Sequence, residues 1–188
     1  MSAARTITTP AEIGEGVTAY ARTLGCGTAE YVAVHPGADA IEDQPFYNTV
    51  MAGEGAPVFG WLIWELTGFW LEAARHAVID RDGTLVDITP PLDGETRILF
   101  VRDPDWAFDY LAPKPPRRAP RFLLTDDPDV RAWAALADEV DTLKWRNTRF
   151  RGDRAETTFA PGKDTRRMER LQRDYNAAAR IALAKALP

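Results

Sequence analysis

The sequence predicts an α+β protein in which a small antiparallel sheet packs with helices and a helical C-terminal extension follows. Short runs rich in Val, Ile and Leu are grouped between residues 30 and 102, and two of them flank Asp82-Gly83, a strong hairpin signal. Apolar residues also recur at helical spacing near the N-terminus and in the last third of the chain. The proline-rich segment 113–120 separates these parts, because its prolines fix φ and lack a backbone donor.

The first half of the chain is expected to alternate helices and strands. Thr9-Pro10-Ala11-Glu12 has the pattern of a capping box with Pro at the first helical position, and Gly25 is expected to end that helix. The expected strands are residues 30–35, 57–65, 71–80, 84–89 and 97–102, with a brief helix at 46–51.

Two helices are predicted beyond the proline-rich segment. Asp127-Pro128 begins the first, which reaches residue 144, and the second begins near Asp164. Their apolar faces are Val130, Trp133, Leu136 and Val140 in the first, and Met168, Leu171, Tyr175 and Ala178 in the second. We therefore divide the chain into an α+β core at 1–112, a connector at 113–120, and a helical extension at 121–188 that packs on the core.

Composition indicates a soluble globular protein. The chain has 188 residues, 45% hydrophobic and 27% charged, which is enough for one substantial core. The longest apolar run, residues 58–71, is interrupted by Glu65 and is too short to span a bilayer. The N-terminus lacks a basic segment followed by an apolar one, and the single cysteine excludes an internal disulfide. We expect a cytoplasmic protein without a membrane partner, and no pattern specifies an oligomeric state.

The formal net charge of −5 is unevenly distributed. Residues 151–188 carry nine Lys and Arg against five Asp and Glu, a net charge of +4 that leaves −9 for the rest. The acidic remainder argues against a nucleic-acid partner. The basic stripe on the last helix is then a solvated face, with nucleic-acid binding as the alternative.

One histidine and one aspartate are expected to meet across the predicted hairpin. If Asp82 and Gly83 form the turn, His76 and Asp87 lie on the same face as diagonal cross-strand neighbours, roughly 7 Å apart at the backbone. A carboxylate there fixes the imidazole tautomer and raises its basicity, as in an acid–base dyad. The structural alternative makes His76 a half-buried strand residue and Asp87 a residue that bonds the turn before Pro90.

Three strings around this hairpin carry a resemblance: G-W-x-I-W-E at 60–65, E-A-x-x-H-A-V at 72–78 and D-G-x-L-V-D-I-T-P at 82–90. They resemble a family of small bacterial and phage proteins and, more distantly, the papain/transglutaminase-like fold. The likeness covers about residues 33–91. It implies a nucleophilic cysteine at a helix start, with histidine and aspartate following on adjacent strands.

The sequence departs from that family at the nucleophile. The resemblance implies a cysteine three residues before an Asn-Val-like pair, and here Pro45 takes that place before Asn48. Proline suits the first turn of a helix, so the helix is expected to persist without thiol chemistry. Cys26, between Gly25 and Gly27, is expected to be a turn residue and not a displaced nucleophile.

Aromatic and acidic residues surround the predicted dyad. We expect Trp61 and Trp64 to line an apolar cleft, with Glu72 and Glu65 as secondary polar groups, and Asn48 to contribute to substrate binding. The alternative is that the aromatic side chains only pack the sheet against its helices.

Metal binding is the rival chemistry. His35 and His76 are the two histidines, and with Glu72 or Asp87 they would form a two-histidine, one-carboxylate set, although no close ligand spacing is present. Phosphate-loop and dinucleotide patterns are absent, and Ser2 is the one serine, which excludes a serine triad.

The favoured function is therefore a small enzyme without a cofactor or a metal site. His76, oriented by Asp87, acts as general acid or base on a small polar, amino-acid-like or amide, substrate. The alternatives are an inactive pseudoenzyme that binds a ligand or a protein segment in the same pocket, and the metal-dependent enzyme.

Overall fold

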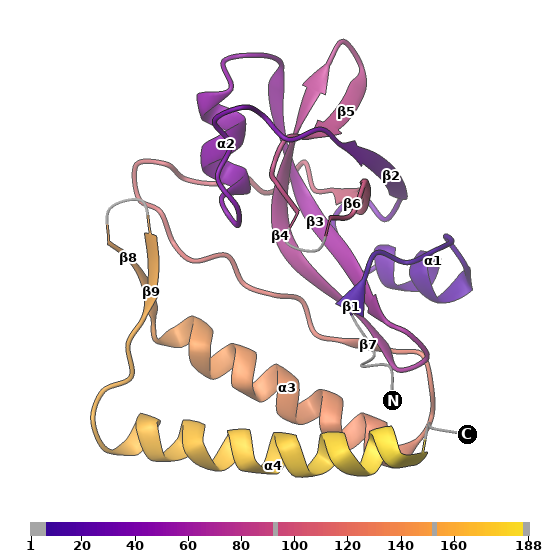
Figure 1. The fold of residues 1–188 in the computed structure, drawn as a ribbon, viewed down its shortest axis with the longest axis vertical. Helices are drawn as coiled ribbons and strands as arrows, with labels where there is room; N and C mark the ends of the chain where they lie inside the picture. The colour runs from indigo at the N-terminus through magenta and orange to yellow at the C-terminus, as the bar shows by residue number, and fades with distance from the viewer. Residues whose placement is uncertain (1–6, 92–93, 152–153, 186–188) are drawn as a thin grey trace.

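The computed structural model describes residues 7–91, 94–151 and 154–185, and Ser2 lies outside these ranges. It confirms the α+β class, with helices and a sheet of mixed strand direction (Figure 1). The strands are β1 (Ile7–Thr8), β2 (Ala29–Val34), β3 (Ala56–Leu66), β4 (Trp70–Arg81), β5 (Thr84–Asp87), β6 (Arg97–Arg102), β7 (Phe122–Leu123), β8 (Thr148–Arg151) and β9 (Arg154–Thr157). The helices are α1 (Glu15–Ala21), α2 (Pro45–Met51), α3 (Pro128–Arg146) and α4 (Lys163–Lys185).

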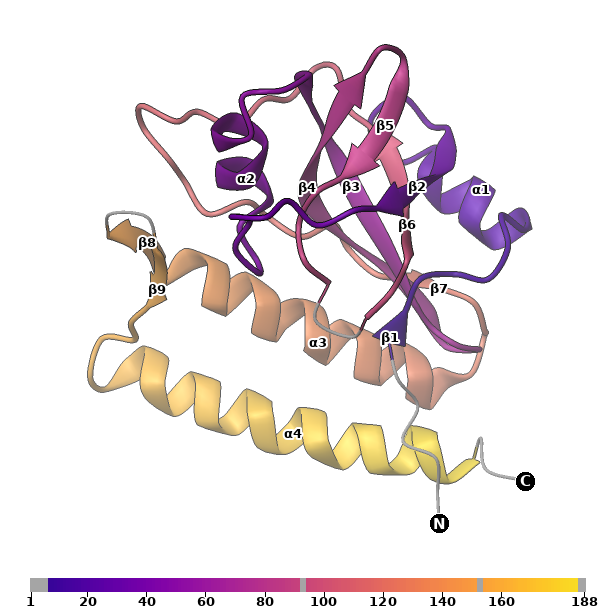
Figure 2. The same cartoon turned by 45° about the horizontal axis from the view of Figure 1, so that its top comes forward.

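Five of the strands close into a barrel (Figure 2). Around the ring the order is β3, β6, β2, β5 and β4, and β4 pairs again with β3. Strands β2 and β5 are parallel, whereas the other neighbours in the ring are antiparallel. The expectation of an antiparallel sheet is therefore wrong for one pair, because α2 and the β3–β4 hairpin carry the chain back before β5 begins.

The interior of the barrel is filled with apolar side chains at one end. Phe100 is fully buried among Val32, Leu62, Val78 and Leu85. Its ring lies against Gly60, where an added Cβ would be 2.6 Å from Phe100 Cζ and 2.1 Å from the carbonyl oxygen of Val101. Only glycine leaves room for this packing, and Gly60 is the partner of His76 in the β3–β4 register. The buried apolar cluster around Phe100 therefore extends to the β3–β4 position that His76 occupies.

Helix α1 covers the outer face of the barrel. Tyr20 and Leu24 pack in one buried cluster with Ile63, Leu71 and Leu99 of the strands. The hydroxyl of Tyr20 donates a hydrogen bond to the carbonyl of Pro120, 2.9 Å away, which ties the connector to this face. Burial, followed by the neighbouring Asp138 and Glu72, raises the pKa of Tyr20.

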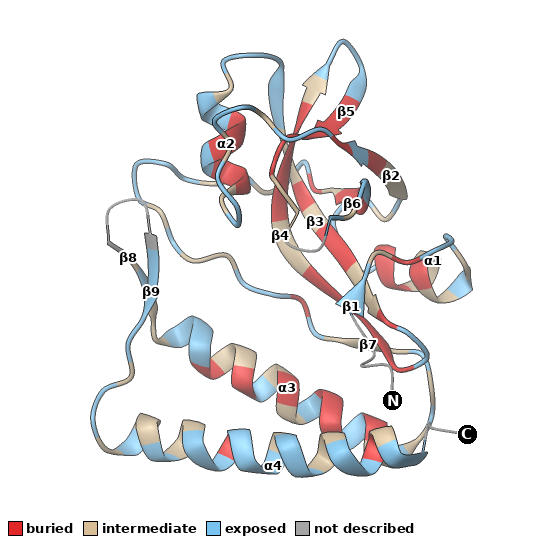
Figure 3. Ribbon diagram, in the orientation of Figure 1, coloured by how far each residue is buried: buried red, intermediate tan, exposed pale blue. Residues whose placement is uncertain are grey.

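The helices α3 and α4 form an antiparallel pair beneath the barrel, joined through β8 and β9 (Figure 1). They pack on the turn between β3 and β4, where Trp70 and Trp133 make an edge contact with ring centroids 4.5 Å apart. Buried residues concentrate in the strands and along α3, while α4 exposes most of its length (Figure 3). Between Arg102 and Phe122 the chain has neither helix nor strand. The predicted domain boundaries stay a prediction.

Two local expectations need correction. The first helix begins at Glu15 and ends at Ala21, later and shorter than expected. The main-chain N–H and the hydroxyl of Thr9 donate to the carboxylate of Glu95, 86 residues away, so Thr9 does not cap that helix. The hairpin of β8 and β9 was also not predicted, because its strands are short and polar.

Candidate active site

The candidate site lies where β4 and β5 separate. Their pairing runs from Arg81–Thr84 to Ile79–Val86, and β5 then turns toward β2, with the His35 N–H donating to the Asp87 carbonyl at 2.8 Å. At the other end of β4 the connector arrives, with the Ala119 N–H donating to the Ala73 carbonyl at 3.0 Å. Between these points no strand in the described part of the chain pairs with β4 on this edge. The opening leads into a cavity of about 480 Å³ at the polar end of the barrel.

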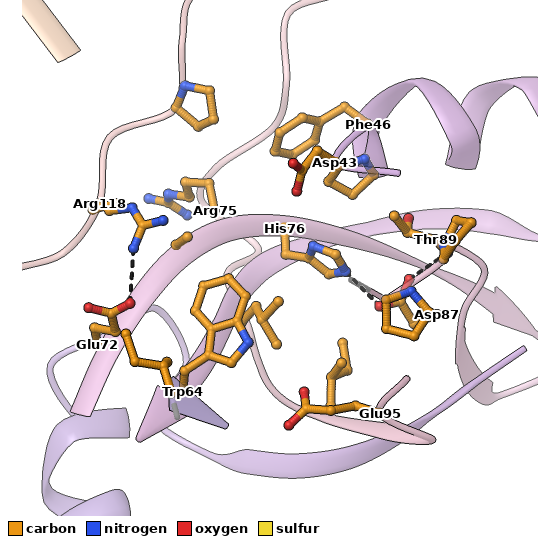
Figure 4. Close-up of a pocket in the computed structure, with 18 residues that line it drawn as sticks. Asp43, Phe46, Trp64, Glu72, Arg75, His76, Asp87, Thr89, Glu95 and Arg118 are labelled. Carbon is orange, nitrogen blue, oxygen red and sulfur yellow. Dashed lines mark hydrogen bonds and ion pairs between the residues drawn. The ribbon is translucent and has the colours of Figure 1, made fainter. Parts of the chain in front are cut away.

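His76 and Asp87 bridge this opening. His76 Nε2 lies 2.8 Å from Asp87 Oδ2, and the two side chains are only 9% and 3% exposed (Figure 4). The turn residues Asp82 and Gly83 both have positive φ, 53° and 85°, and Arg81 faces Thr84, which confirms the predicted register. His76 and Asp87 therefore meet across the hairpin, as the sequence predicted.

The second oxygen of Asp87 fixes the carboxylate. Asp87 Oδ1 accepts a hydrogen bond from the Thr89 N–H at 2.9 Å. Opposite a carboxylate that only accepts, the neutral ring of His76 would donate from Nε2, and Nδ1 would be its acceptor nitrogen. Within the described part of the chain Nδ1 has no hydrogen-bond partner, and His76 lines the cavity. This arrangement presents a basic nitrogen to whatever occupies the cavity.

Asn48 supports the wall behind the dyad. Its side chain exchanges two hydrogen bonds with the main chain of Ile41, at 2.9 and 2.8 Å, and donates to the Thr89 hydroxyl at 3.2 Å. It is buried and does not line the cavity. The position predicted to bind substrate thus holds the loop before α2 against the end of β5.

Glu72 lies in the same cavity, two residues along the inward face of β4 from Ala74. Its carboxylate accepts from Arg118 at 3.1 Å and pairs with Arg121 at 2.9 Å, so the charge is balanced although the side chain is 7% exposed. Trp64 is its register partner on β3 and lines the cavity beside it. Figure 4 shows Glu72 and Arg118 on the opposite side of His76 from Asp87.

Two predicted residues lie elsewhere. Trp61 faces the outer side of the barrel, where its ring stacks on the guanidinium of Arg75 at 3.8 Å and its Nε1 donates to Asp103 at 3.3 Å. Glu65 is half-buried beside Thr8 of β1 and does not line the cavity. Successive residues of a strand point to opposite faces, so Trp61 and Glu65 share the outer face and Trp64 the inner one.

Several lining residues were missed. Asp43, Phe46, Glu95 and Arg118 all border the cavity. Asp43 sits just before α2 with φ of 59°, a conformation that non-glycine residues rarely adopt. Arg118 belongs to the segment interpreted only as a spacer. The pair Arg117-Arg118 in this segment was the one available sign of a functional role. No local pattern predicts that Arg118 contacts Glu72, 46 residues earlier in the chain.

The alternative sets of catalytic residues do not assemble in the described part of the chain. His35 is exposed and does not line the cavity with His76. In residues 7–91, 94–151 and 154–185, no three His, Cys, Asp or Glu side chains are grouped as metal ligands would be. Cys26 is exposed, away from the lining of this cavity.

Comparison with protein-family models, with curated proteins and with solved structures gave no match. The site is therefore interpreted from its own geometry. None of the described helices is both long enough and apolar enough to cross a bilayer.

Proposed function

We propose that the protein is an enzyme that acts on a small polar substrate, amino-acid-like or an amide, by acid–base chemistry at His76 and Asp87. The observation that carries this proposal is the buried 2.8 Å contact that ties Nε2 to Asp87, while His76 lines the cavity and its Nδ1 has no hydrogen-bond partner among the described residues. A structural histidine needs no such free nitrogen. An acid–base residue requires one within reach of its substrate.

In the proposed reaction His76 Nδ1 accepts a proton either from the substrate or from a water molecule that attacks the substrate. The imidazolium that forms is stabilised by Asp87, which keeps its negative charge. The same nitrogen then returns the proton to the leaving group. General acid–base catalysis of this kind contributes about 10²–10⁴ in rate.

The cavity is compatible with a small ligand. At about 480 Å³ it falls in the usual range for small-molecule sites, roughly 300–1,000 Å³. Its wall combines Leu62, Trp64 and Phe46 with the ion pair of Glu72 and Arg118. Apolar walls with a few polar groups orient a small polar substrate while keeping most water out.

A distant relationship to the papain/transglutaminase-like fold is part of this proposal. Two features support this relationship. His76 and Asp87 come from adjacent strands, and Pro45, at the start of α2, lines the cavity that they also line. With proline at the nucleophile position, the chemistry proposed is noncovalent. A cytoplasmic location is also proposed, supported by the single cysteine and the acidic composition.

A binding protein without turnover is the second candidate. The observation that favours it is Pro45, because a fold that has lost its nucleophile often retains its pocket. In that case the same residues hold a ligand or a peptide segment and Asp87 only orients His76 as a hydrogen-bond partner.

The test is a substrate screen with a matched variant. Wild-type protein and His76→Gln are incubated with a panel of amino acids, their amides and small peptides, and products are followed by mass spectrometry. His76→Gln keeps a donor for Asp87 but removes the basic nitrogen, so turnover should fall by about 10²–10⁴ with little change in the melting temperature. Turnover that survives in His76→Gln would reject the acid–base role. Ligand binding without any turnover would select the pseudoenzyme.

A further inference from the structure

A second cavity, of about 690 Å³, lies on the outer face of the barrel beside the first. Four arginines line it, together with aromatic rings from α1, β3, β7 and the segment that follows β6. The arginines are Arg75, Arg117, Arg118 and Arg121, and no acidic residue among those that the structure describes lines the cavity. The wall of this cavity is therefore cationic and aromatic, although the chain as a whole carries a charge of −5.

The arginines differ in how far they are already neutralised. Arg121 pairs with Glu72, Asp138 and Asp141 at 2.9, 2.7 and 3.0 Å, so three carboxylates already neutralise its positive charge. Arg118 is 44% exposed and shares Glu72 with Arg121. Arg117 is exposed, and within the described residues no carboxylate is paired with it. Two guanidinium groups thus retain donors for a ligand.

Arg75 is held rigidly at the back of the cavity. Its guanidinium carbon lies 3.8 Å from the Trp61 ring centroid and 4.3 Å from that of Trp106, and its Nη1 donates to Asp103 at 2.6 Å. A guanidinium held by two rings and a carboxylate has little conformational freedom left, which reduces the entropy lost when it binds a further partner.

The two cavities are adjacent. Arg75 and Arg118 line both of them, one from β4 and the other from the connector. In Figure 4 both side chains border the dyad's cavity on the side of Glu72, away from Asp87. A ligand of moderate length could therefore reach from His76, past Arg118, into the second cavity.

We infer that the second cavity is an oxyanion subsite, which binds a carboxylate or phosphate group at Arg117 and Arg118 beside Arg75. Planar guanidinium groups bind both anions through paired charge-assisted hydrogen bonds. Resting on the proposed function, the subsite further defines the substrate as one with an anionic group at the end remote from the reacting centre. Because both arginines are accessible to solvent, binding weakens with added salt.

The subsite can be tested with simple anions, without knowing the substrate. Inorganic phosphate and acetate are titrated separately into the full-length protein, and the indole resonances of Trp61 and Trp106 are followed by NMR. We expect saturable shifts for at least one anion, and binding at least tenfold weaker in Arg117→Gln and in Arg118→Gln. Arg131→Gln, an exposed arginine at the start of α3, is the matched control and should bind as the wild type does.

The inference is overturned if neither anion gives saturable shifts, or if Arg131→Gln weakens binding as much as the two cavity variants do. Circular dichroism confirms that the variants are folded, as expected for exposed side chains. His76→Gln separates this inference from the proposed function, since it should bind the anion normally. Anion binding that persists without any His76-dependent turnover would reject the proposed reaction and keep the subsite, whereas turnover without anion binding would reject the subsite alone.

Discussion

Arg121 joins the barrel to the helical pair, and its removal is the most informative perturbation of stability. The side chain is 10% exposed and pairs with Glu72 of β4 and with Asp138 and Asp141 of α3. The substitution Arg121→Leu leaves the buried Glu72 with Arg118 alone. It also removes the positive charge that Glu72, Asp138 and Asp141 share. Removing one partner of a buried ion pair costs about 3–5 kcal/mol. Asp138 and Asp141 are 34% and 25% exposed and can turn to water, so the lower end, about 3 kcal/mol, is expected.

Urea unfolding, monitored by tryptophan fluorescence and circular dichroism, measures this loss. For a domain of this size 3 kcal/mol corresponds to a decrease in melting temperature of about 6–12 °C. The double variant Glu72→Leu with Arg121→Leu should recover part of the stability, because it removes the uncompensated buried carboxylate as well. A loss below about 1 kcal/mol, no larger than that of the exposed control Arg131→Leu, would refute the view that this network stabilises the contact between barrel and helices.

Three further predictions concern packing, pH and the proposed relationship. Gly60→Ala should destabilise the protein by about 1–3 kcal/mol in urea unfolding, because its Cβ would lie 2.1 Å from a carbonyl oxygen; unchanged stability would contradict the packing inside the barrel. Tyr20 has a raised pKa in the folded state, so stability should fall as pH rises above the ordinary value of 10.0, and Tyr20→Phe should flatten this alkaline decrease; equal profiles would contradict its burial. In a Cys26→Ala background, Pro45→Cys should be alkylated by iodoacetamide faster than free cysteine, and this excess should disappear in His76→Gln; a rate independent of His76 would argue against the resemblance at that position.

The parts of the fold that could be predicted from sequence depend on local chemistry. The Asp-Gly turn fixed the register of β4 and β5, and the two-residue period then placed His76 opposite the end of β5. The start of α3 was equally local, since the Asp127 side chain accepts hydrogen bonds from the N–H groups of Asp129 and Val130. These features involve residues within about a dozen positions of one another, where propensity and turn geometry decide the outcome.

The features that sequence did not predict depend on distant segments. Closure of the barrel requires β6 to pair with both β2 and β3, and no local pattern encodes these partners. Closure also decides which face of β3 points inward, and for that reason Trp64 lines the cavity and Trp61 does not. The first helix starts late because Glu95, far along the chain, binds Thr9. Arg118 was missed for the same reason, because the connector places it beside Glu72, a residue far away in the sequence.

The central claim is that Asp87 holds His76 in one tautomer with Nδ1 free toward the cavity, and long-range ¹H–¹⁵N NMR of the imidazole nitrogens measures this directly. The chain has two histidines, so the exposed His35 serves as an internal control and should show both tautomers in rapid exchange. For neutral His76 we predict a proton on Nε2, an unprotonated Nδ1, and loss of this preference in Asp87→Asn. A proton on Nδ1, or a His76 ring that averages between tautomers as His35 does, would contradict the account.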